Sequence, residues 1–265
     1  MQTATATKLN LQSVDRISLE QQVKDMYQRV AENPNGEFHF EMGRALCERL
    51  GYKPADLDSI PAEAIKSFAG VGYYFHLADL KEGESVLDLG SGSGTDTFIA
   101  ALQVGASGHV TGVDMTDAQR AKAEELRDEI GFTHVDYLKS YIEDLPLDDA
   151  SYDAVISNGV FNLSPEKDKV FQEIVRVLKP GGRLAISDIV TEQPLPEGIS
   201  CSADLWAACI GGAMQEDAYC QAIEVAGLSV VKVEPMPYEF ISDNATGAAE
   251  KWGVKAVSLL ATKPA

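Results

Sequence analysis

The chain has 265 residues, of which 45% are hydrophobic and 24% charged, and its formal net charge is −19 at neutral pH. This length allows one large domain, or one domain with an appendage. Such a negative charge disfavours long-range attraction to nucleic acid or to an anionic membrane surface. No apolar run approaches the roughly 20 residues of a membrane-spanning helix. We therefore expect neither nucleic acid nor a membrane as a partner.

The first fifteen residues, MQTATATKLNLQSVD, lack a basic segment followed by an apolar core, so no secretory signal is expected. We therefore expect the protein to be cytoplasmic. The four cysteines are then expected to be thiols rather than disulfides. They are Cys47, Cys201, Cys209 and Cys220, and no Cys-x-x-Cys pair occurs among them. The four histidines are isolated in the sequence, and no metal site is expected.

The region before residue 80 is predicted to be a set of short helices. Apolar residues follow helical spacing over residues 18–31, where Ser18 is a candidate N-cap, and again over residues 42–50. A stretch rich in glycine and aromatic residues, 68–75, comes just before the first strong strand pattern. We expect residues 1–80 to form an N-terminal helical cap over the functional site of the second region, 81–265. The alternative is that these helices only brace the sheet.

From residue 84 onward, strand and helix patterns alternate. This alternation predicts an α/β fold with a doubly wound, seven-stranded, mostly parallel sheet. The strands are expected over residues 85–89, 109–114, 134–138, 152–157, 183–189, 228–235 and 254–262, and the helices over 95–104, 116–130, 165–178 and 203–226. The sequence Lys-Pro-Gly-Gly at 179–182 predicts a turn before the fifth strand. Ligands of such sheets bind at the carboxyl ends of the strands, where the strand order reverses.

The segment VLDLGSGSG, residues 86–94, carries the clearest functional signal. Its apolar half is typical of a buried parallel strand, and Asp88 lies within it. Gly90, Gly92 and Gly94 then allow a sharp turn and a close approach of the backbone to a ligand. Because a helix is expected to follow at once, its N-terminus would face the same ligand. The segment, including Ser91, is therefore a candidate binding turn.

Asp114 lies twenty residues after Gly94, at the tip of the second expected strand. An acid in this position commonly accepts hydrogen bonds from both ribose hydroxyls, which predicts a nucleoside site. Thr95 stands where the dinucleotide fingerprint requires glycine, and Asp88 would repel a pyrophosphate. A sulfonium and an ammonium group, as in S-adenosylmethionine, suit such an acid better. The simpler alternative is a tight turn followed by a surface aspartate.

These segments resemble the class I S-adenosylmethionine-dependent methyltransferases, with their Rossmann-like fold. YIEDLP at 141–146 is similar to the loop of that family that holds adenine, and EIVRVLKPGGRL at 173–184 to a segment before its fifth strand. The resemblance implies S-adenosylmethionine as the cofactor. It also implies adenine contacts from Met115 and Ile142, and an acceptor for the exocyclic amine in Glu143. The expected cofactor-binding residues are Asp88, Gly90, Ser91, Gly92, Gly94, Asp114, Met115, Ile142, Glu143 and Asn158.

A narrower resemblance covers about residues 46–262. Segments such as VGASGHVTGVDMTDAQ, ISNGVFNLSPEKDKVF and ACIGGAM are similar to the arsenite methyltransferase branch of the family. That branch binds arsenite through three cysteine thiolates. Only Cys209 matches one of them, whereas the other two positions fall on Val71 and Gly159. Arsenic(III) needs two or three thiolates to be held tightly. With one matching cysteine, this chain departs from the arsenite-binding pattern of that branch.

Methyl transfer requires alignment of the nucleophile, the methyl group and sulfur, without an obligatory acid or base. Cys209, Tyr73 and Asn162 are the candidate catalytic residues on the acceptor side. The favoured function is methyl transfer from S-adenosylmethionine to a small-molecule acceptor, which could be a quinone-type carbon. One alternative is a true arsenite or metalloid methyltransferase that uses Cys209 with Cys201 or Cys47. A further alternative is a non-catalytic protein that binds S-adenosylmethionine. The sequence makes no prediction of the oligomeric state.

Overall fold

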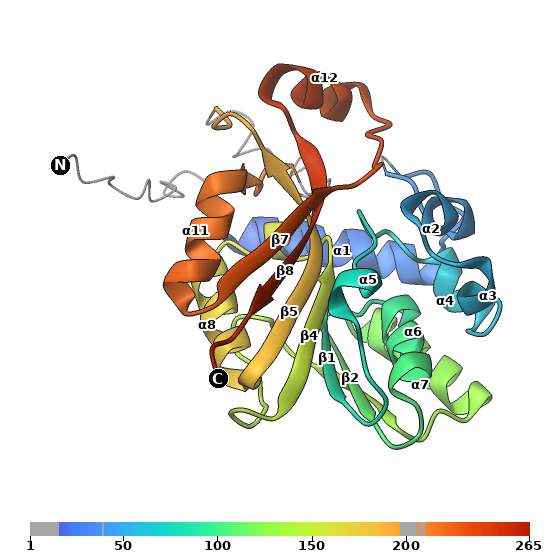
Figure 1. Ribbon diagram of the computed structural model, residues 1–265. Helices are drawn as coiled ribbons and strands as arrows, with labels where there is room; N and C mark the ends of the chain where they lie inside the picture. Colours follow the sequence, from blue (N-terminus) through green and yellow to red (C-terminus); the bar gives the residue numbers. More distant parts are fainter. Residues whose placement is uncertain (1–15, 39, 197–205, 207–209) are drawn as a thin grey trace.

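A mixed sheet forms the centre of the structure, a computed structural model that describes residues 16–38, 40–196, 206 and 210–265 (Figure 1). Its eight strands follow the order β3-β2-β1-β4-β5-β8-β7, with β6 paired to β5. Strand β8 is antiparallel to both neighbours, and the other pairs are parallel. The bounds are β1 (Ser85–Leu89), β2 (His109–Asp114), β3 (Val135–Lys139), β4 (Tyr152–Asn158), β5 (Leu178–Thr191), β6 (Met214–Gln215), β7 (Ser229–Pro235) and β8 (Lys255–Thr262). The expected α/β sheet is confirmed, and the short β6 is added to the seven predicted strands.

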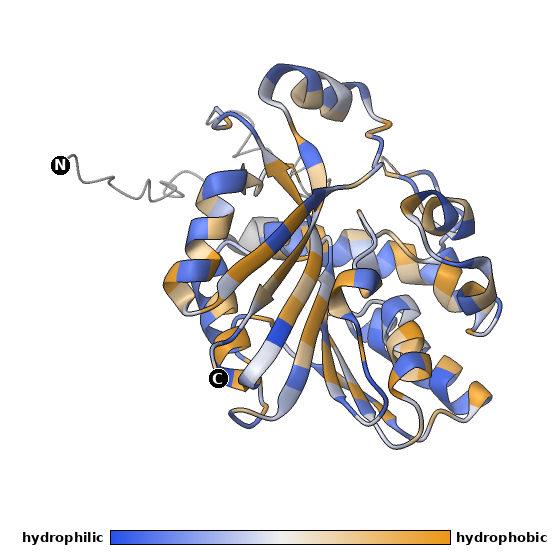
Figure 2. Cartoon of the chain, viewed as in Figure 1, coloured by the Kyte–Doolittle hydropathy of each residue, from blue (hydrophilic) through white to orange (hydrophobic). Residues whose placement is uncertain are grey.

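Helices cover both faces of the sheet, on opposite sides in Figure 1. They are α6 (Thr95–Val104) and α7 (Asp117–Ile130) on one face, and α8 (Lys167–Val177) and α11 (Glu216–Ala226) on the other. Successive residues of β1 serve the two layers: Val86 packs in the core with Phe98 of α6, and Leu87 in the core with Phe171 of α8. A strand that is buried on both faces needs a continuous apolar run. Figure 2 shows this run along the central strands.

In the described part of the chain, five helices precede the sheet, and the last four of them contribute residues to its core. They are α1 (Arg16–Glu32), α2 (Arg44–Leu50), α3 (Pro54–Leu57), α4 (Ala62–Lys66) and α5 (Phe75–Ala78). Leu46 of α2 and Phe75 of α5 belong to the same apolar cluster as Val86. The cap of residues 1–80 stays a prediction as a separate domain. Ser18 is not an N-cap, because α1 begins two residues earlier.

The long helix predicted over residues 203–226 is wrong. The chain turns at residues 210–213, forms β6, and begins α11 only at Glu216. Two glycines explain this break, since glycine weakens a helix interior and both are packed tightly. A Cβ atom on Gly212 would lie 1.9 Å from the backbone oxygen of Asn162, and one on Gly211 would lie 2.3 Å from the ring of Trp206. Residues 197–205 and 207–209 lie outside the described part of the chain.

Two further elements were not predicted as they occur. Strand β5 begins at Leu178, so the expected turn at 179–182 is an irregularity within the strand, where Gly181 has φ 77°. Helix α12 (Asp243–Trp252) was missed, and Figure 1 shows it beyond the sheet, between β7 and β8. Ser242 caps it by accepting a hydrogen bond from the Ala245 amide. Within the described ranges, we find no helix with the length and apolar content needed to cross a bilayer.

Candidate functional site

The glycine turn connects β1 to α6 at the point where the strand order reverses. Gly90, Gly92 and Gly94 have φ values of 73°, 54° and 96°, which favour glycine. Space is also restricted: a Cβ atom on Gly90 would lie 2.3 Å from the Val160 side chain, and one on Gly94 would lie 2.3 Å from the Tyr137 hydroxyl oxygen. The turn therefore requires glycine at both ends, and its backbone lies open to the space above β1.

Asp114, at the end of β2, is tied to this turn. Its Oδ2 accepts from the Gly92 amide at 3.0 Å, and its Oδ1 accepts from the Thr116 amide at 2.8 Å. Burial raises the pKa of Asp114, and the hydrogen bonds from Thr116 and Gly92 oppose the increase. Because each carboxylate oxygen has a second lone pair, both oxygens can still accept from a diol. The geometry expected of a ribose-binding acid is therefore present.

Two more carboxylates lie beneath the turn. Asp88 of β1 is buried and accepts from the Thr97 hydroxyl at 2.6 Å. Its pKa lies well above the ordinary value, because of burial first and of the neighbouring charge of Asp96 second. Asp96 of α6 was not predicted from the sequence. Its carboxylate accepts from Tyr52, Tyr74 and Asn158, and burial raises its pKa as well.

A cavity of about 590 Å³ opens above the turn. Nine of the ten predicted cofactor-binding residues line it: Asp88, Gly90, Ser91, Gly92, Asp114, Met115, Ile142, Glu143 and Asn158. Gly94 is outside the lining; it is the N-cap residue of α6, and a Cβ atom there would meet Tyr137. The loop of residues 140–144 forms another wall, where Glu143 accepts from the Ser164 hydroxyl at 2.5 Å. The sequence therefore predicted a set of residues that meet at one place, and their role in cofactor binding stays a prediction.

Helix α1 closes one side of the cavity. Glu20, Val23 and Tyr27 contribute to the lining. The Tyr27 carbonyl accepts from Gln119 of α7 at 3.1 Å, and Gln119 in turn accepts from Ser93 of the glycine turn at 2.5 Å. At the other edge, the Tyr141 hydroxyl donates to Glu20 at 2.5 Å. Helix α1 thus forms part of the cavity wall, and the cap over residues 1–80 stays a prediction.

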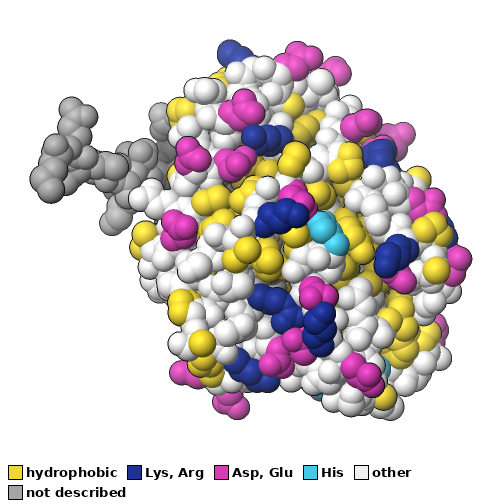
Figure 3. Space-filling view, viewed as in Figure 1, with side chains coloured by type: hydrophobic (Ala, Val, Ile, Leu, Met, Phe, Trp, Pro, Cys, Tyr) yellow, Lys and Arg dark blue, Asp and Glu magenta, His cyan; other side chains and the backbone are white. Residues whose placement is uncertain are grey.

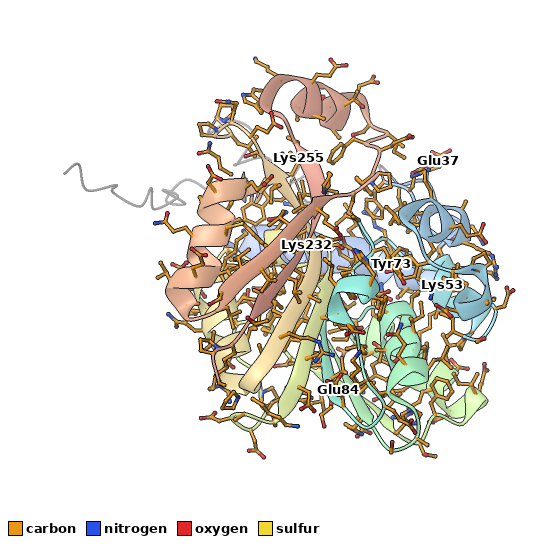
Figure 4. The ribbon with its side chains drawn as sticks, viewed as in Figure 1. Glu37, Lys53, Tyr73, Glu84, Lys232 and Lys255 are labelled. Atoms are coloured by element: carbon orange, nitrogen blue, oxygen red, sulfur yellow. The ribbon has the colours of Figure 1, made fainter. Side chains whose placement is uncertain are left out.

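Two of the three predicted catalytic residues, Tyr73 and Asn162, do not line this cavity. Tyr73 lies beside α5 on the sheet face that is turned to the viewer, between Lys53 and Lys232 in Figure 4, and it stacks on His76. The Tyr73 carbonyl accepts from the Ser258 hydroxyl of β8 at 3.0 Å. Cys209 lies outside the described residues.

Asn162 is the second predicted catalytic residue that the structure places elsewhere. It is fully buried in the 3-10 helix η2 (Phe161–Leu163), and its amide nitrogen donates to the Ile189 carbonyl. Gly212 packs closely against the backbone carbonyl of Asn162. Asn162 therefore ties the end of β4 to β5, and it does not line the cavity.

The positions that correspond to two of the arsenite-binding cysteines lie next to each other. A Cβ atom on Gly159 would lie 3.3 Å from Cγ1 of Val71. Cys47 cannot replace them, because it is fully buried in the core and burial strongly raises the pKa of its thiol. Cys220 lies on α11 and does not line the cavity. Among the residues that the structure describes, no cluster of His, Cys, Asp or Glu could hold a metal ion.

A family model for the methyltransferase domain matches residues 80–227. The chain belongs to this family. The crystal structure of an arsenic(III) S-adenosylmethionine methyltransferase from Chlamydomonas reinhardtii is 32% identical, with a TM-score of 0.66 over 80% of this chain and 72% of that one. The expected class, a methyltransferase that depends on S-adenosylmethionine and resembles the arsenite branch, is confirmed together with its Rossmann-like fold.

Curated relatives agree with this assignment. An arsenite methyltransferase of Halobacterium salinarum is 42% identical over 198 residues, which are 74% of this chain and 50% of the relative. An arsenite methyltransferase of Aquipseudomonas alcaligenes is 46% identical over 142 residues, which are 51% of this chain and 41% of the relative. The matched region thus spans half or less of the length of these relatives.

Proposed function

We propose that the protein transfers the methyl group of S-adenosylmethionine to a small-molecule acceptor. The observation that carries this proposal is the set of carboxylates around the glycine turn. Asp88, Asp96 and Asp114 line one cavity, and in the described part of the chain none of them forms an ion pair with a basic side chain. Asp88 and Asp96 are buried and Asp114 is half-buried, and such carboxylates without a cationic partner suit a ligand that brings its own positive charge.

Different residues of the chain would contact different parts of this cofactor. Asp114 would accept from the ribose hydroxyls, while Met115 and Ile142 would hold adenine between them. Glu143 would accept from its exocyclic amine, and the backbone of the glycine turn would face the amino-acid part. When bound, S-adenosylmethionine supplies an activated methyl group on a positively charged sulfur. The protein then has to orient the acceptor and exclude water, and α1 contributes to the exclusion.

The acceptor side favours an uncharged organic molecule. Val160 and Leu163 form an apolar part of the cavity wall beyond β4, and Gly159 also lines the cavity. The known relatives suggest arsenite as the alternative acceptor. Neither thiol that the structure describes reaches the cavity, so that alternative would depend on Cys201 and Cys209. We further propose that the enzyme is cytoplasmic. We also propose that it does not act on nucleic acid, since the chain's net charge is −19 and the face shown in Figure 3 mixes both charge signs.

A two-step experiment tests the function. Titration calorimetry should show saturable binding of S-adenosylmethionine at a single site, and absence of binding would refute the proposal. A screen of quinols, thiols, small phenols and arsenite should then identify an acceptor that releases S-adenosylhomocysteine. Arsenite is also titrated against the fluorescence of Trp206, which is three residues from Cys209. An unchanged signal at neutral pH is expected, and a saturable change would favour the metalloid alternative.

A further inference from the structure

Asp96 is the centre of a buried hydrogen-bond network beside the cavity. It is the second residue of α6, and its side chain is 5% exposed. Its Oδ1 accepts from the Tyr52 hydroxyl at 2.6 Å, and its Oδ2 accepts from the Tyr74 hydroxyl at 2.7 Å and from Asn158 Nδ2 at 3.1 Å. These donors come from the segment before α3, the start of α5 and the end of β4. One carboxylate thus joins three distant parts of the chain.

Asn158 extends the network to the loop of residues 69–74, which we call the acceptor loop. Asn158 Oδ1 accepts from the amides of Val71 at 2.8 Å and Gly72 at 3.3 Å, and Nδ2 also donates to the Gly72 carbonyl at 3.0 Å. A Cβ atom on Gly70 would lie 2.6 Å from the carboxamide carbon of Asn158. Asn158 therefore fixes the acceptor loop to the end of β4, and Tyr74 of the same loop donates directly to Asp96. Asn158 itself is oriented by Asp96 and by the Tyr52 hydroxyl, to which its Nδ2 also donates at 3.0 Å.

The charge of Asp96 determines the strength of this network. An ionised carboxylate accepts all three hydrogen bonds, whereas a protonated one has a hydrogen of its own that competes with the three donors. Burial raises the pKa of both Asp96 and Asp88, and the two carboxylates face the same cavity. A fixed positive charge bound between them would stabilise the ionised form of each.

We propose that Asp96 is a positioning residue that couples the charge of the cofactor to the acceptor loop. A cationic cofactor strengthens the hydrogen bonds from Tyr52, Tyr74 and Asn158 to Asp96, and Asn158 then holds Val71 and Gly72 in place. The inference rests on the proposed function, since it takes S-adenosylmethionine as the cation. S-adenosylhomocysteine has the same nucleoside and amino-acid parts with a neutral sulfur, so it fixes the acceptor loop less firmly.

Amide hydrogen exchange in the full chain tests this coupling. The Val71 and Gly72 amides are followed at saturating S-adenosylmethionine and at saturating S-adenosylhomocysteine. We expect exchange to be slower with the cationic cofactor by roughly tenfold. Asp96→Asn keeps the size of the side chain but loses the charge, and the difference between the two ligands should disappear. The preference of the protein for S-adenosylmethionine over S-adenosylhomocysteine, measured by calorimetry, should fall in the same variant.

Three further variants separate coupling from general destabilisation. Tyr52→Phe and Tyr74→Phe each remove one donor to Asp96, and each should speed exchange of the acceptor loop in the S-adenosylmethionine complex. Tyr152→Phe removes a buried hydroxyl that donates to Thr111 at 3.0 Å, outside the network, and should leave the ligand difference intact. Equal protection by both ligands in the wild type, or a difference that survives in Asp96→Asn and both tyrosine variants, overturns the coupling. Failure of both ligands to bind would instead refute the proposed function.

Discussion

At the scale of single residues, Asp114 has two tasks in one carboxylate. Its oxygens accept from the Gly92 and Thr116 amides, and we propose that the same oxygens hold the ribose. Removing the carboxylate should therefore destabilise the conformation of the glycine turn and also remove the contact with the nucleoside. This double role explains why an acid in this position can be half-buried without a basic partner.

Asp114→Ala should raise the dissociation constant of S-adenosylmethionine by roughly one hundredfold, because hydrogen bonds to a charged acceptor contribute about 1.5–3 kcal/mol. Titration calorimetry measures the change. Asp117→Ala is the matched control, since this exposed acid of α7 pairs with Lys139 outside the cavity. It should bind as the wild type does. Unchanged affinity in Asp114→Ala would remove Asp114 from the site.

At the scale of secondary-structure elements, the turn between β1 and α6 is the most constrained. Gly90 and Gly131 share a φ of 73°, but only Gly90 is crowded: a Cβ atom there would meet Val160, whereas the space around Gly131 is open. Alanine at either position is strained by a positive φ of the same size. The comparison of the two substitutions therefore isolates the contribution of packing.

Gly90→Ala should lower the free energy of unfolding by about 1–3 kcal/mol more than Gly131→Ala, since forced overpacking adds to the strain. Denaturant titration of both variants measures the difference. Binding of S-adenosylmethionine should be lost or weakened only in Gly90→Ala, because Gly131 ends α7 away from the cavity. Equal destabilisation by the two substitutions would show that Val160 moves aside at little cost.

Helix α1 can be tested as the cover of the cavity. Val23 is buried and lines the cavity from this helix. Val23→Asp should displace α1, because an unpaired charge is costly to bury, and cofactor dissociation should become roughly tenfold faster in stopped-flow measurements. Gln28→Ala alters the exposed face of the same helix, where Gln28 donates to Glu32, and should have no effect. An unchanged dissociation rate in Val23→Asp would contradict a covering role.

The elements that the sequence predicted well are those whose own residues determine them. The apolar run of β1 and the caps of α7 are local signals, so their bounds agree with the structure to within a residue. The prediction of one helix over residues 203–226 was wrong because Gly211 and Gly212 pack against Trp206 and Asn162. Such contacts are not visible in a sequence. For α12, Ser242 and Gly253 were usable signals at its two ends.

The candidate site shows the same division. Residues that belong to a local motif, such as the glycine turn and Asp114, lie at one cavity. Asp96 was missed, although an acid in the first turn of a helix is a visible feature, because its partners Tyr52, Tyr74 and Asn158 are distant in the sequence. Tyr73 was expected on the acceptor side of the site, but its side chain stacks on His76 and does not line the cavity.

At the scale of the whole molecule, buried acids make stability depend on pH. Asp188 of β5 is fully enclosed, accepts from the Ile189 amide and the Tyr219 hydroxyl, and burial raises its pKa to about 6. Because the pKa is higher in the folded state, the stabilisation by this group is complete below about pH 4 and is lost as the pH rises to 6. A shift of this size corresponds to about 3 kcal/mol.

Asp188→Asn should remove this part of the pH dependence. The free energy of unfolding of the variant, relative to the wild type, is expected to increase between pH 4 and 6 by about 3 kcal/mol. Denaturant titrations at several pH values measure this difference. Tyr219→Phe keeps the titrating carboxyl and loses one hydrogen bond, so it should be destabilised with the pH dependence retained. A constant difference between Asp188→Asn and the wild type would contradict the assignment.

The central claim concerns the whole cavity: the glycine turn, the carboxylates and the loop of residues 140–144 together bind a cationic sulfur nucleoside. A crystal structure of the full chain with S-adenosylmethionine tests it most directly. The account predicts adenine between Met115 and Ile142, and both ribose hydroxyls within about 3 Å of Asp114. A ligand bound elsewhere on the molecule, or one whose ribose does not contact Asp114, would contradict it.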